Sequence, residues 1–157
     1  MESQKKYWNI DPASGALLQS LIHTHKPQNI LEVGTSNGYS AILMGNVAKS
    51  YGGHIKTIEF FGERVQLARE NIQKEELSET IEVLQGDALE ILSRFLPLPE
   101  GELEGVGVFD FIFLDAAKEE HADYFKFAMQ LMPLGGIIVA DNTISHKNKL
   151  SEFFEKV

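Results

Sequence analysis

The sequence contains no cysteine among its 157 residues, and this absence excludes several kinds of site. A chain without thiols has no disulfide, no thiolate metal centre and no cysteine nucleophile. Long apolar runs are also missing, because no stretch approaches the roughly 18 consecutive apolar residues of a membrane span. The first twelve residues, MESQKKYWNIDP, lack the apolar run of a signal peptide. We therefore expect a soluble, cytoplasmic protein with no membrane partner.

Basic residues are in the minority. The chain carries 14 lysines and arginines against 23 acidic residues, which gives a formal net charge of -9. This balance argues against a broad electrostatic contact with a nucleic-acid backbone or an anionic membrane surface. A small-molecule substrate is the favoured expectation. The length suits one globular domain, so residues 1–157 are predicted to form a single domain.

Short apolar runs alternate with longer amphipathic stretches, a pattern typical of a parallel sheet covered by helices on both faces. The predicted fold class is therefore α/β, a doubly wound and mostly parallel sheet. The five predicted strands are 30–33, 55–59, 81–84, 109–114 and 137–140. Helices are predicted to begin near Asp11 and to cover 39–51, 63–77, 87–96, 124–132 and 147–157, with a surface loop over 97–107.

A glycine-bearing turn follows the first predicted strand, in the segment ILEVGTSNGYS of residues 30–40. Gly34 and Gly38 allow the backbone to pass close to a ligand ahead of a helix N-terminus. The spacing differs from the three-glycine dinucleotide fingerprint, so a nicotinamide-dependent dehydrogenase is not favoured. Backbone amides, Ser40 and Glu32 instead suit the carboxylate and ammonium of a methionine group. An ordinary strand-to-helix connection is the alternative.

Acidic residues follow the second and third strands. Glu59 ends the second strand, about twenty residues beyond the glycine turn, where a carboxylate can accept both hydroxyl protons of a ribose. Asp87, in Gly86-Asp87-Ala88, is placed to accept a hydrogen bond from an adenine amino group. Each has a structural alternative: Glu59 as a solvated strand end, and Asp87 as the N-cap of the next helix.

Asp115 ends the fourth strand in FDFIFLDAAK, and Asp141-Asn142 ends the fifth in IIVADN. If these strands are neighbours, two carboxylates and an amide oxygen converge at one edge of the sheet. Hard oxygen ligands suit Mg²⁺, or Mn²⁺ or Ca²⁺, and do not suit zinc. The alternative is that each aspartate caps a helix independently. Lys118 lies three residues after Asp115 and is the candidate base.

Together these segments resemble the metal-dependent class I S-adenosylmethionine-dependent O-methyltransferases of the catechol and caffeoyl-CoA type. The blocks LEVGTSNGYSA, TIE, GDA, FDFIFLDAAK and GGIIVADN match that family in order. The resemblance implies a Rossmann-like sheet with strand order 3-2-1-4-5. It also implies methyl transfer to a metal-held hydroxyl, with Lys118 as the catalytic base and Asp115, Asp141 and Asn142 as metal ligands. It implies cofactor contacts from Glu32, Gly34, Ser36, Tyr39, Ser40, Glu59, Phe60, Asp87, Ala88 and Asp115.

The chain departs from this family at its C-terminus, where members continue into an antiparallel pair of strands. We expect the apolar fifth strand to be an edge that is covered by the final helix, by a second copy in a homodimer, or by residues absent from this sequence. Two other functions stay open. One is a methyltransferase of the same fold that acts on a hydroxyl of a tRNA base, and the other is a non-catalytic cofactor-binding module.

Overall fold

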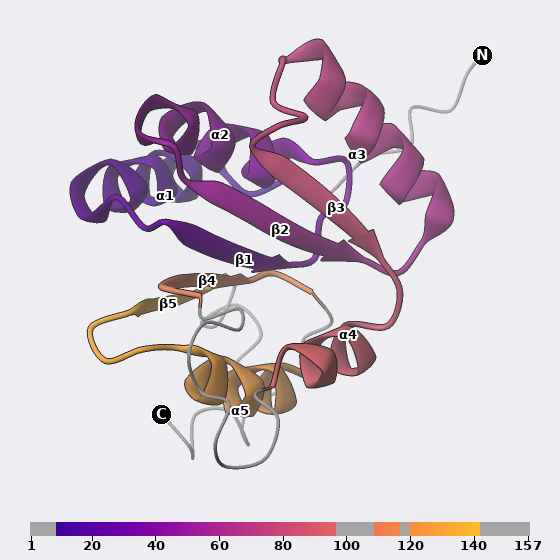
Figure 1. Cartoon of the computed structure of the whole chain (residues 1–157). Helices are drawn as coiled ribbons and strands as arrows, with labels where there is room; N and C mark the ends of the chain where they lie inside the picture. Colours follow the sequence, from indigo (N-terminus) through magenta and orange to yellow (C-terminus); the bar gives the residue numbers. More distant parts are fainter. Residues whose placement is uncertain (1–8, 97–108, 117–119, 142–157) are drawn as a thin grey trace.

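The computed structural model describes residues 9–96, 109–116 and 120–141. Within these residues five strands form one parallel sheet in the order β3-β2-β1-β4-β5 (Figure 1). Their bounds are β1 Asn29–Val33, β2 His54–Glu59, β3 Ile81–Gln85, β4 Phe111–Leu114 and β5 Ile137–Ala140. The predicted fold class and strand order are confirmed.

The strand register aligns the carboxyl ends of neighbouring strands along one edge. Val33 of β1 pairs with Ile58 of β2 on one side and with Leu114 of β4 on the other. Leu114 in turn pairs with Ala140 of β5. Because all the pairings are parallel, the residues that follow each strand emerge at the same edge of the sheet. This edge is where open α/β sheets bind ligands.

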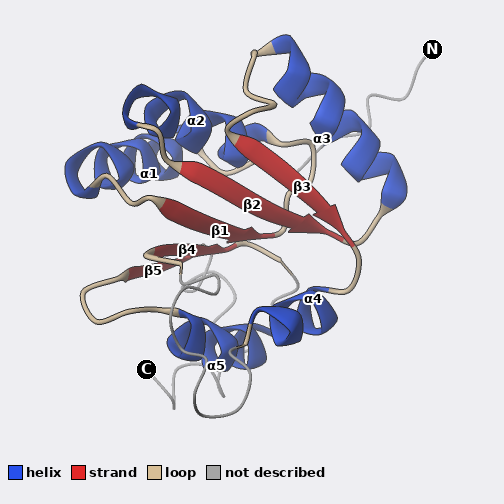
Figure 2. Cartoon of the chain, in the orientation of Figure 1, coloured by secondary structure: helices blue, strands red, loops and turns tan. Residues whose placement is uncertain are grey.

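Helices cover both faces of the sheet, as Figure 2 shows. One face packs against α1 Pro12–His25, α2 Tyr39–Ala48 and α3 Gly62–Lys74, and a 3₁₀ helix, η1 Lys49–Tyr51, follows α2. The other face packs against α4 Ala88–Phe95 and α5 His121–Leu131. Alternate residues of β1 serve the two faces: Ile30 belongs to the first core and Leu31 to the second. Both are fully buried, so each contributes about 1.5–3 kcal/mol of hydrophobic stabilisation.

The helix ends follow local sequence signals. Asp11 caps α1 as predicted, because its carboxylate accepts hydrogen bonds from the backbone N–H groups of Ala13 and Ser14, at 2.9 and 3.1 Å. The fourth strand begins later than predicted, at Phe111, because the N–H of Phe109 donates to the carbonyl of Leu131 on α5. That helix starts at His121, three residues before the predicted position.

Several predictions fall outside the described residues. They are the surface loop over 97–107, the final helix over 147–157, and the positions of Lys118 and Asn142. No helix in the described part of the chain is both long and apolar enough to cross a membrane. The single domain and the homodimer stay predictions.

Candidate functional site

The residues just beyond the strands remain hydrogen-bonded to the ends of neighbouring strands, so the sheet pairing continues past the carboxyl edge. The N–H of Asp115 donates to the carbonyl of Val33 at 2.9 Å, and the N–H of Asp141 donates to the carbonyl of Leu114 at 3.0 Å. On the other side, the N–H of Gly34 donates to the carbonyl of Ile58 at 3.0 Å. The loops after β1, β4 and β5 are thereby fixed relative to one another.

Gly34 is required by this arrangement. Its φ is +104°, a conformation that favours glycine, and a Cβ at this position would lie 2.7 Å from the carbonyl oxygen of Asp115. The backbones that leave β1 and β4 therefore approach each other more closely than any side chain permits. The strand order reverses between these two strands, which makes this the topological switch point of the sheet.

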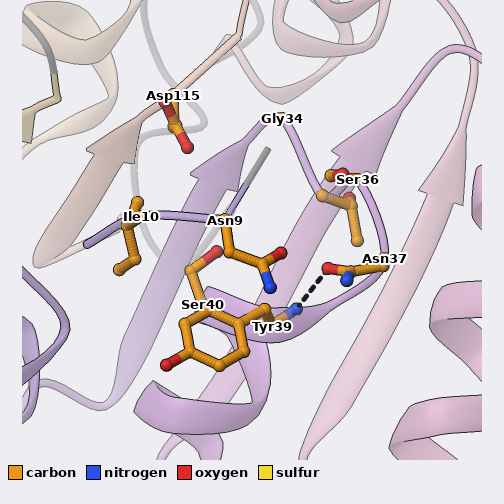
Figure 3. A pocket seen from close by; sticks show the side chains of 9 residues that line it. Asn9, Ile10, Gly34, Ser36, Asn37, Tyr39, Ser40 and Asp115 are labelled. Atoms are coloured by element: carbon orange, nitrogen blue, oxygen red, sulfur yellow. Dashed lines mark hydrogen bonds between the residues drawn. The ribbon is translucent and has the colours of Figure 1, made fainter. Parts of the chain in front are cut away.

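A hollow lies at the switch point (Figure 3). Asp115 faces it from the end of β4, and the loop that leads into α2 faces it from the other side. The hollow is lined by Asn9, Ile10, Gly34, Thr35, Ser36, Asn37, Tyr39, Ser40 and Asp115. The structure therefore brings together five of the predicted cofactor residues, namely Gly34, Ser36, Tyr39, Ser40 and Asp115.

Glu59 holds the glycine loop in place. Its carboxylate accepts hydrogen bonds from the backbone N–H of Ser36, at 2.8 Å, and from that of Phe61, at 3.0 Å. Ser36 has a positive φ of 52°, and this bond helps to fix that uncommon conformation. Glu59 is buried with 6% of its surface exposed, so it is a structural part of the loop in addition to its predicted ribose contact.

Helix α3 supports the same loop from below. The side-chain amide of Asn71 donates to the carbonyl of Asn37 at 2.9 Å. A Cβ on Gly38, whose φ is +87°, would lie 3.4 Å from the Cα of Ala68. The loop is therefore packed and hydrogen-bonded on its inner side.

Asp87 is the N-cap of α4, because its carboxylate accepts a hydrogen bond from the N–H of Glu90 at 2.9 Å. The structural alternative to an adenine contact is thus present, and a single capping bond leaves the carboxylate with further acceptor capacity. Asp87, Ala88, Glu59 and Phe60 stand outside the residues that line the hollow. Phe60 is 61% exposed beside Glu59. Their cofactor contacts stay predictions.

Glu32 lies beneath the loop and is completely buried. One carboxylate oxygen accepts a hydrogen bond from the Ser40 hydroxyl, and the other accepts one from the Thr57 hydroxyl. Burial raises the pKa of Glu32 to about 8; the two hydroxyl groups oppose this shift, whereas the negative charges of Asp115 and Glu59 add to it. Glu32 itself is absent from the lining of the hollow, and Ser40 stands between them.

The buried carboxyl of Glu32 predicts a pH-dependent stability. An unfolded glutamate loses its proton near pH 4.5, whereas folded Glu32 keeps its proton until about pH 8. Its contribution is therefore complete below pH 4.5 and is lost as the pH rises toward 8. Between pH 5 and pH 8 the free energy of unfolding should fall further in the wild type than in Glu32→Gln, by at most about 4 kcal/mol. Urea unfolding at both pH values measures the difference, and equal falls in the two proteins would contradict the assignment.

Asp115 and Asp141 extend neighbouring strands, each one residue beyond the paired Leu114 and Ala140. Neighbouring strands lie about 4.8 Å apart, so the two aspartates leave the sheet side by side. Among the described residues no group of three or more His, Cys, Asp and Glu side chains is placed to hold a metal ion. The predicted third ligand is an amide from Asn142, which lies outside those residues.

Sequence reasoning missed Thr35, Thr57 and Asn71. Thr57 pairs with Glu32 in the register of β1 and β2, and Thr35 contacts Thr57 at 2.6 Å between their hydroxyl oxygens. One signal was available at Glu32, which is a carboxylate between the apolar Leu31 and Val33 and therefore needs a buried partner. Thr57 gave none, because its strand, HIKTIE, mixes polar and apolar residues. Asn71 gave no signal, since an asparagine on an amphipathic helix is commonly solvent-exposed.

The parallel sheet, the glycine loop and the hollow at the switch point define a doubly wound α/β protein with a ligand site at the carboxyl edge. A family model described as O-methyltransferase matches residues 2–152. The chain therefore belongs to the O-methyltransferase family, which confirms the resemblance drawn from the sequence.

Individual relatives agree with this assignment. The chain is 35% identical over 144 residues to a catechol O-methyltransferase of Niastella koreensis, with 92% of this chain and 62% of that protein covered. It is 34% identical to caffeoyl-CoA O-methyltransferase 2 of Populus trichocarpa, with 89% and 56% covered. The fold matches an O-methyltransferase from Bacillus cereus in complex with SAH, with a TM-score of 0.82, 32% identity, and 95% and 70% covered. The chain thus spans about three fifths of the length of these two curated relatives.

Proposed function

We propose that this chain binds S-adenosylmethionine in the hollow at the switch point and transfers its methyl group to a hydroxyl oxygen of a small acceptor. The observation that carries the proposal is the position of Asp115 directly opposite the glycine loop, across that hollow. The names of two relatives, which act on catechol and caffeoyl-CoA, support an aromatic acceptor with two neighbouring hydroxyls. The SAH-bound relative supports the choice of cofactor.

The chain's own residues suit the parts of this cofactor. The loop amides and the Ser40 hydroxyl are placed for the methionine carboxylate and ammonium. Glu32 lies behind Ser40, and a bound ammonium favours the charged form of its carboxylate. Glu59 accepts hydrogen bonds from two amides, and its remaining lone pairs are available for ribose hydroxyls. Asp87 and Ala88, at the start of α4, are assigned to the adenine. Tyr39, which lines the hollow, and the exposed Phe60 are assigned as further cofactor contacts.

The donor set fits a hard divalent cation. Asp115 and Asp141 offer carboxylate oxygens from neighbouring strand ends, and Mg²⁺ is commonly bound through one or two carboxylates with water completing the shell. We assign Asp115, Asp141 and Asn142 as ligands of Mg²⁺, with Mn²⁺ or Ca²⁺ as substitutes. When bound, such an ion lowers the pKa of a coordinated hydroxyl.

Methyl transfer forms one oxygen–carbon bond and breaks one sulfur–carbon bond, and the sulfur keeps the bonding pair. The hydroxyl proton must be removed, and Lys118 is assigned as its acceptor. Because a positive sulfur and a negative oxygen are both neutralised, little new charge has to be stabilised. Most of the rate acceleration should therefore come from holding the two reactants in contact, which the rigid loop and strand ends favour.

The test is methyl transfer by the full 157-residue chain from labelled S-adenosylmethionine to catechol. We expect product with Mg²⁺, a loss of about 100-fold or more with a chelator, and recovery when Mg²⁺ is restored. Transfer that is insensitive to the chelator would contradict the metal assignment. Binding of S-adenosylhomocysteine without transfer to any diol would instead indicate a non-catalytic module. Methylation of tRNA, weakened steeply by salt, would indicate an RNA acceptor.

A further inference from the structure

Four polar side chains, one from the glycine loop and three from the elements around it, form a continuous buried hydrogen-bonded network. Thr35 contacts Thr57, Thr57 donates to Glu32, and Ser40 donates to the other oxygen of Glu32. Thr35, Thr57 and Glu32 are each at most 1% exposed, and Ser40 is 6% exposed. Thr35 and Ser40 line the hollow, whereas Thr57 and Glu32 lie in the sheet interior, so the network connects the interior with the ligand site.

The Thr57 hydroxyl is a polar group in a completely buried position. Thr57 lies on β2 inside the sheet, and the nearby strand residues Ile55 and Ile58 are apolar and buried. Valine has the same shape and a high strand propensity, and burial of a hydroxyl is unfavourable unless the hydroxyl is hydrogen-bonded. The Thr57 hydroxyl makes two hydrogen bonds, one with the Thr35 hydroxyl and one to the buried carboxylate of Glu32, which is paired with Thr57 in the register of β1 and β2.

We propose that Thr57 is a positioning residue of the cofactor site. Supported by Thr35, it fixes the Glu32 carboxylate against Ser40, so that the charge of Glu32, from behind Ser40, attracts a primary ammonium group bound in the hollow. This inference rests on the proposed cofactor, whose methionine group carries such an ammonium. Without the hydroxyl, one oxygen of Glu32 loses its partner in the sheet interior, and the carboxylate is free to rotate away from Ser40.

Removal of the hydroxyl should also change the ionisation of Glu32. The hydrogen bond from Thr57 favours the charged carboxylate and so lowers its pKa, against burial and the charges of Asp115 and Glu59. An ammonium ligand pairs with the charged form. In Thr57→Val, the pH at which ligand affinity reaches half its maximum should therefore move upward.

The experiment measures the affinity of the full chain for S-adenosylhomocysteine by calorimetry between pH 6 and pH 9, together with thermal unfolding of the free protein. We expect Thr57→Val to bind about tenfold more weakly at pH 7.5, with the pH midpoint moved upward, because a hydrogen bond to a charged group is lost. Thr57→Ser should restore both quantities. Thr35→Val removes the support for Thr57 at a residue that also lines the hollow, and it leaves the bond between Thr57 and Glu32 in place. It should shift the midpoint less and in the same direction.

The matched control is Thr80→Val, because Thr80 is also buried but precedes β3 at the opposite edge of the sheet. It should leave the affinity and its pH midpoint unchanged. Wild-type affinity and midpoint in Thr57→Val would overturn the role of Thr57 and leave the cofactor site intact. A loss of affinity that Thr57→Ser fails to rescue would also overturn it. Failure of the wild type to bind S-adenosylhomocysteine would overturn the proposed function itself.

Discussion

Replacement of Gly34 by alanine is expected to destabilise the fold by about 3 kcal/mol and to abolish cofactor binding. Two effects combine at this position. The φ of +104° strains any residue that has a Cβ, and the new methyl group would lie 2.7 Å from the Asp115 carbonyl oxygen. Relief requires the ends of β1 and β4 to separate, and the hollow lies between them. Urea unfolding and calorimetry with S-adenosylhomocysteine measure the two losses.

Gly52→Ala is the matched control for this prediction. Gly52 has a similar φ of +80°, but a Cβ there would have no atom within 4 Å. Its replacement carries the backbone strain alone, about 1 kcal/mol, and should leave ligand affinity unchanged. If Gly34→Ala and Gly52→Ala proved equally stable, the close contact between the two strand ends would be of no importance to the fold.

The second large effect is expected for Asp141→Asn, which should lower the rate of methyl transfer by about 100- to 1000-fold. The substitution keeps the shape of the side chain and removes its charge, so a divalent cation loses one anionic ligand. Asp141 is partly exposed at the end of β5, and the bond from its backbone N–H to Leu114 is retained. Urea unfolding of Asp141→Asn separates the loss of a metal ligand from a loss of stability. Steady-state rates over a range of Mg²⁺ concentrations measure the loss, and excess Mg²⁺ should recover part of it.

Asp110→Asn is the matched control, because Asp110 is an aspartate beside the same sheet but away from the proposed metal site. Asp110 precedes β4 at the far edge of the sheet, and its carboxylate accepts hydrogen bonds from the N–H groups of Gln28 and Asn29, both at 2.8 Å. Its replacement should reduce stability, because those charge-assisted bonds weaken, and should not change the Mg²⁺ dependence. An unchanged rate in Asp141→Asn would remove that residue from the metal site.

The burial of the central strands could be predicted from their composition, because residues 30–33 and 111–114 are apolar apart from Glu32, as central parallel strands must be. The order of the strands was predicted through the family resemblance. Boundaries were less predictable. Phe109 is as apolar as the strand it precedes, yet its N–H pairs with α5, and only the tertiary packing determines this.

The candidate site was predictable where it depends on topology alone. Gly34, Asp115 and Asp141 directly follow strands, so a parallel sheet places them at one edge whatever the details of packing. The bond between Thr57 and Glu32 depends on the register of β1 and β2, which the sequence does not encode locally. The support from Asn71 depends on how α3 lies under the loop. Such contacts between distant segments require the structure.

The central claim is that a cofactor and a hard cation meet at the ends of β1, β4 and β5. A crystal of the chain grown with S-adenosylhomocysteine and Mn²⁺ tests it most directly, because manganese is located by its anomalous scattering. The account predicts ligand density along Gly34–Ser40 and one anomalous peak in contact with the carboxylates of Asp115 and Asp141. Ligand density at another edge of the sheet, or two aspartates directed away from any peak, would contradict it.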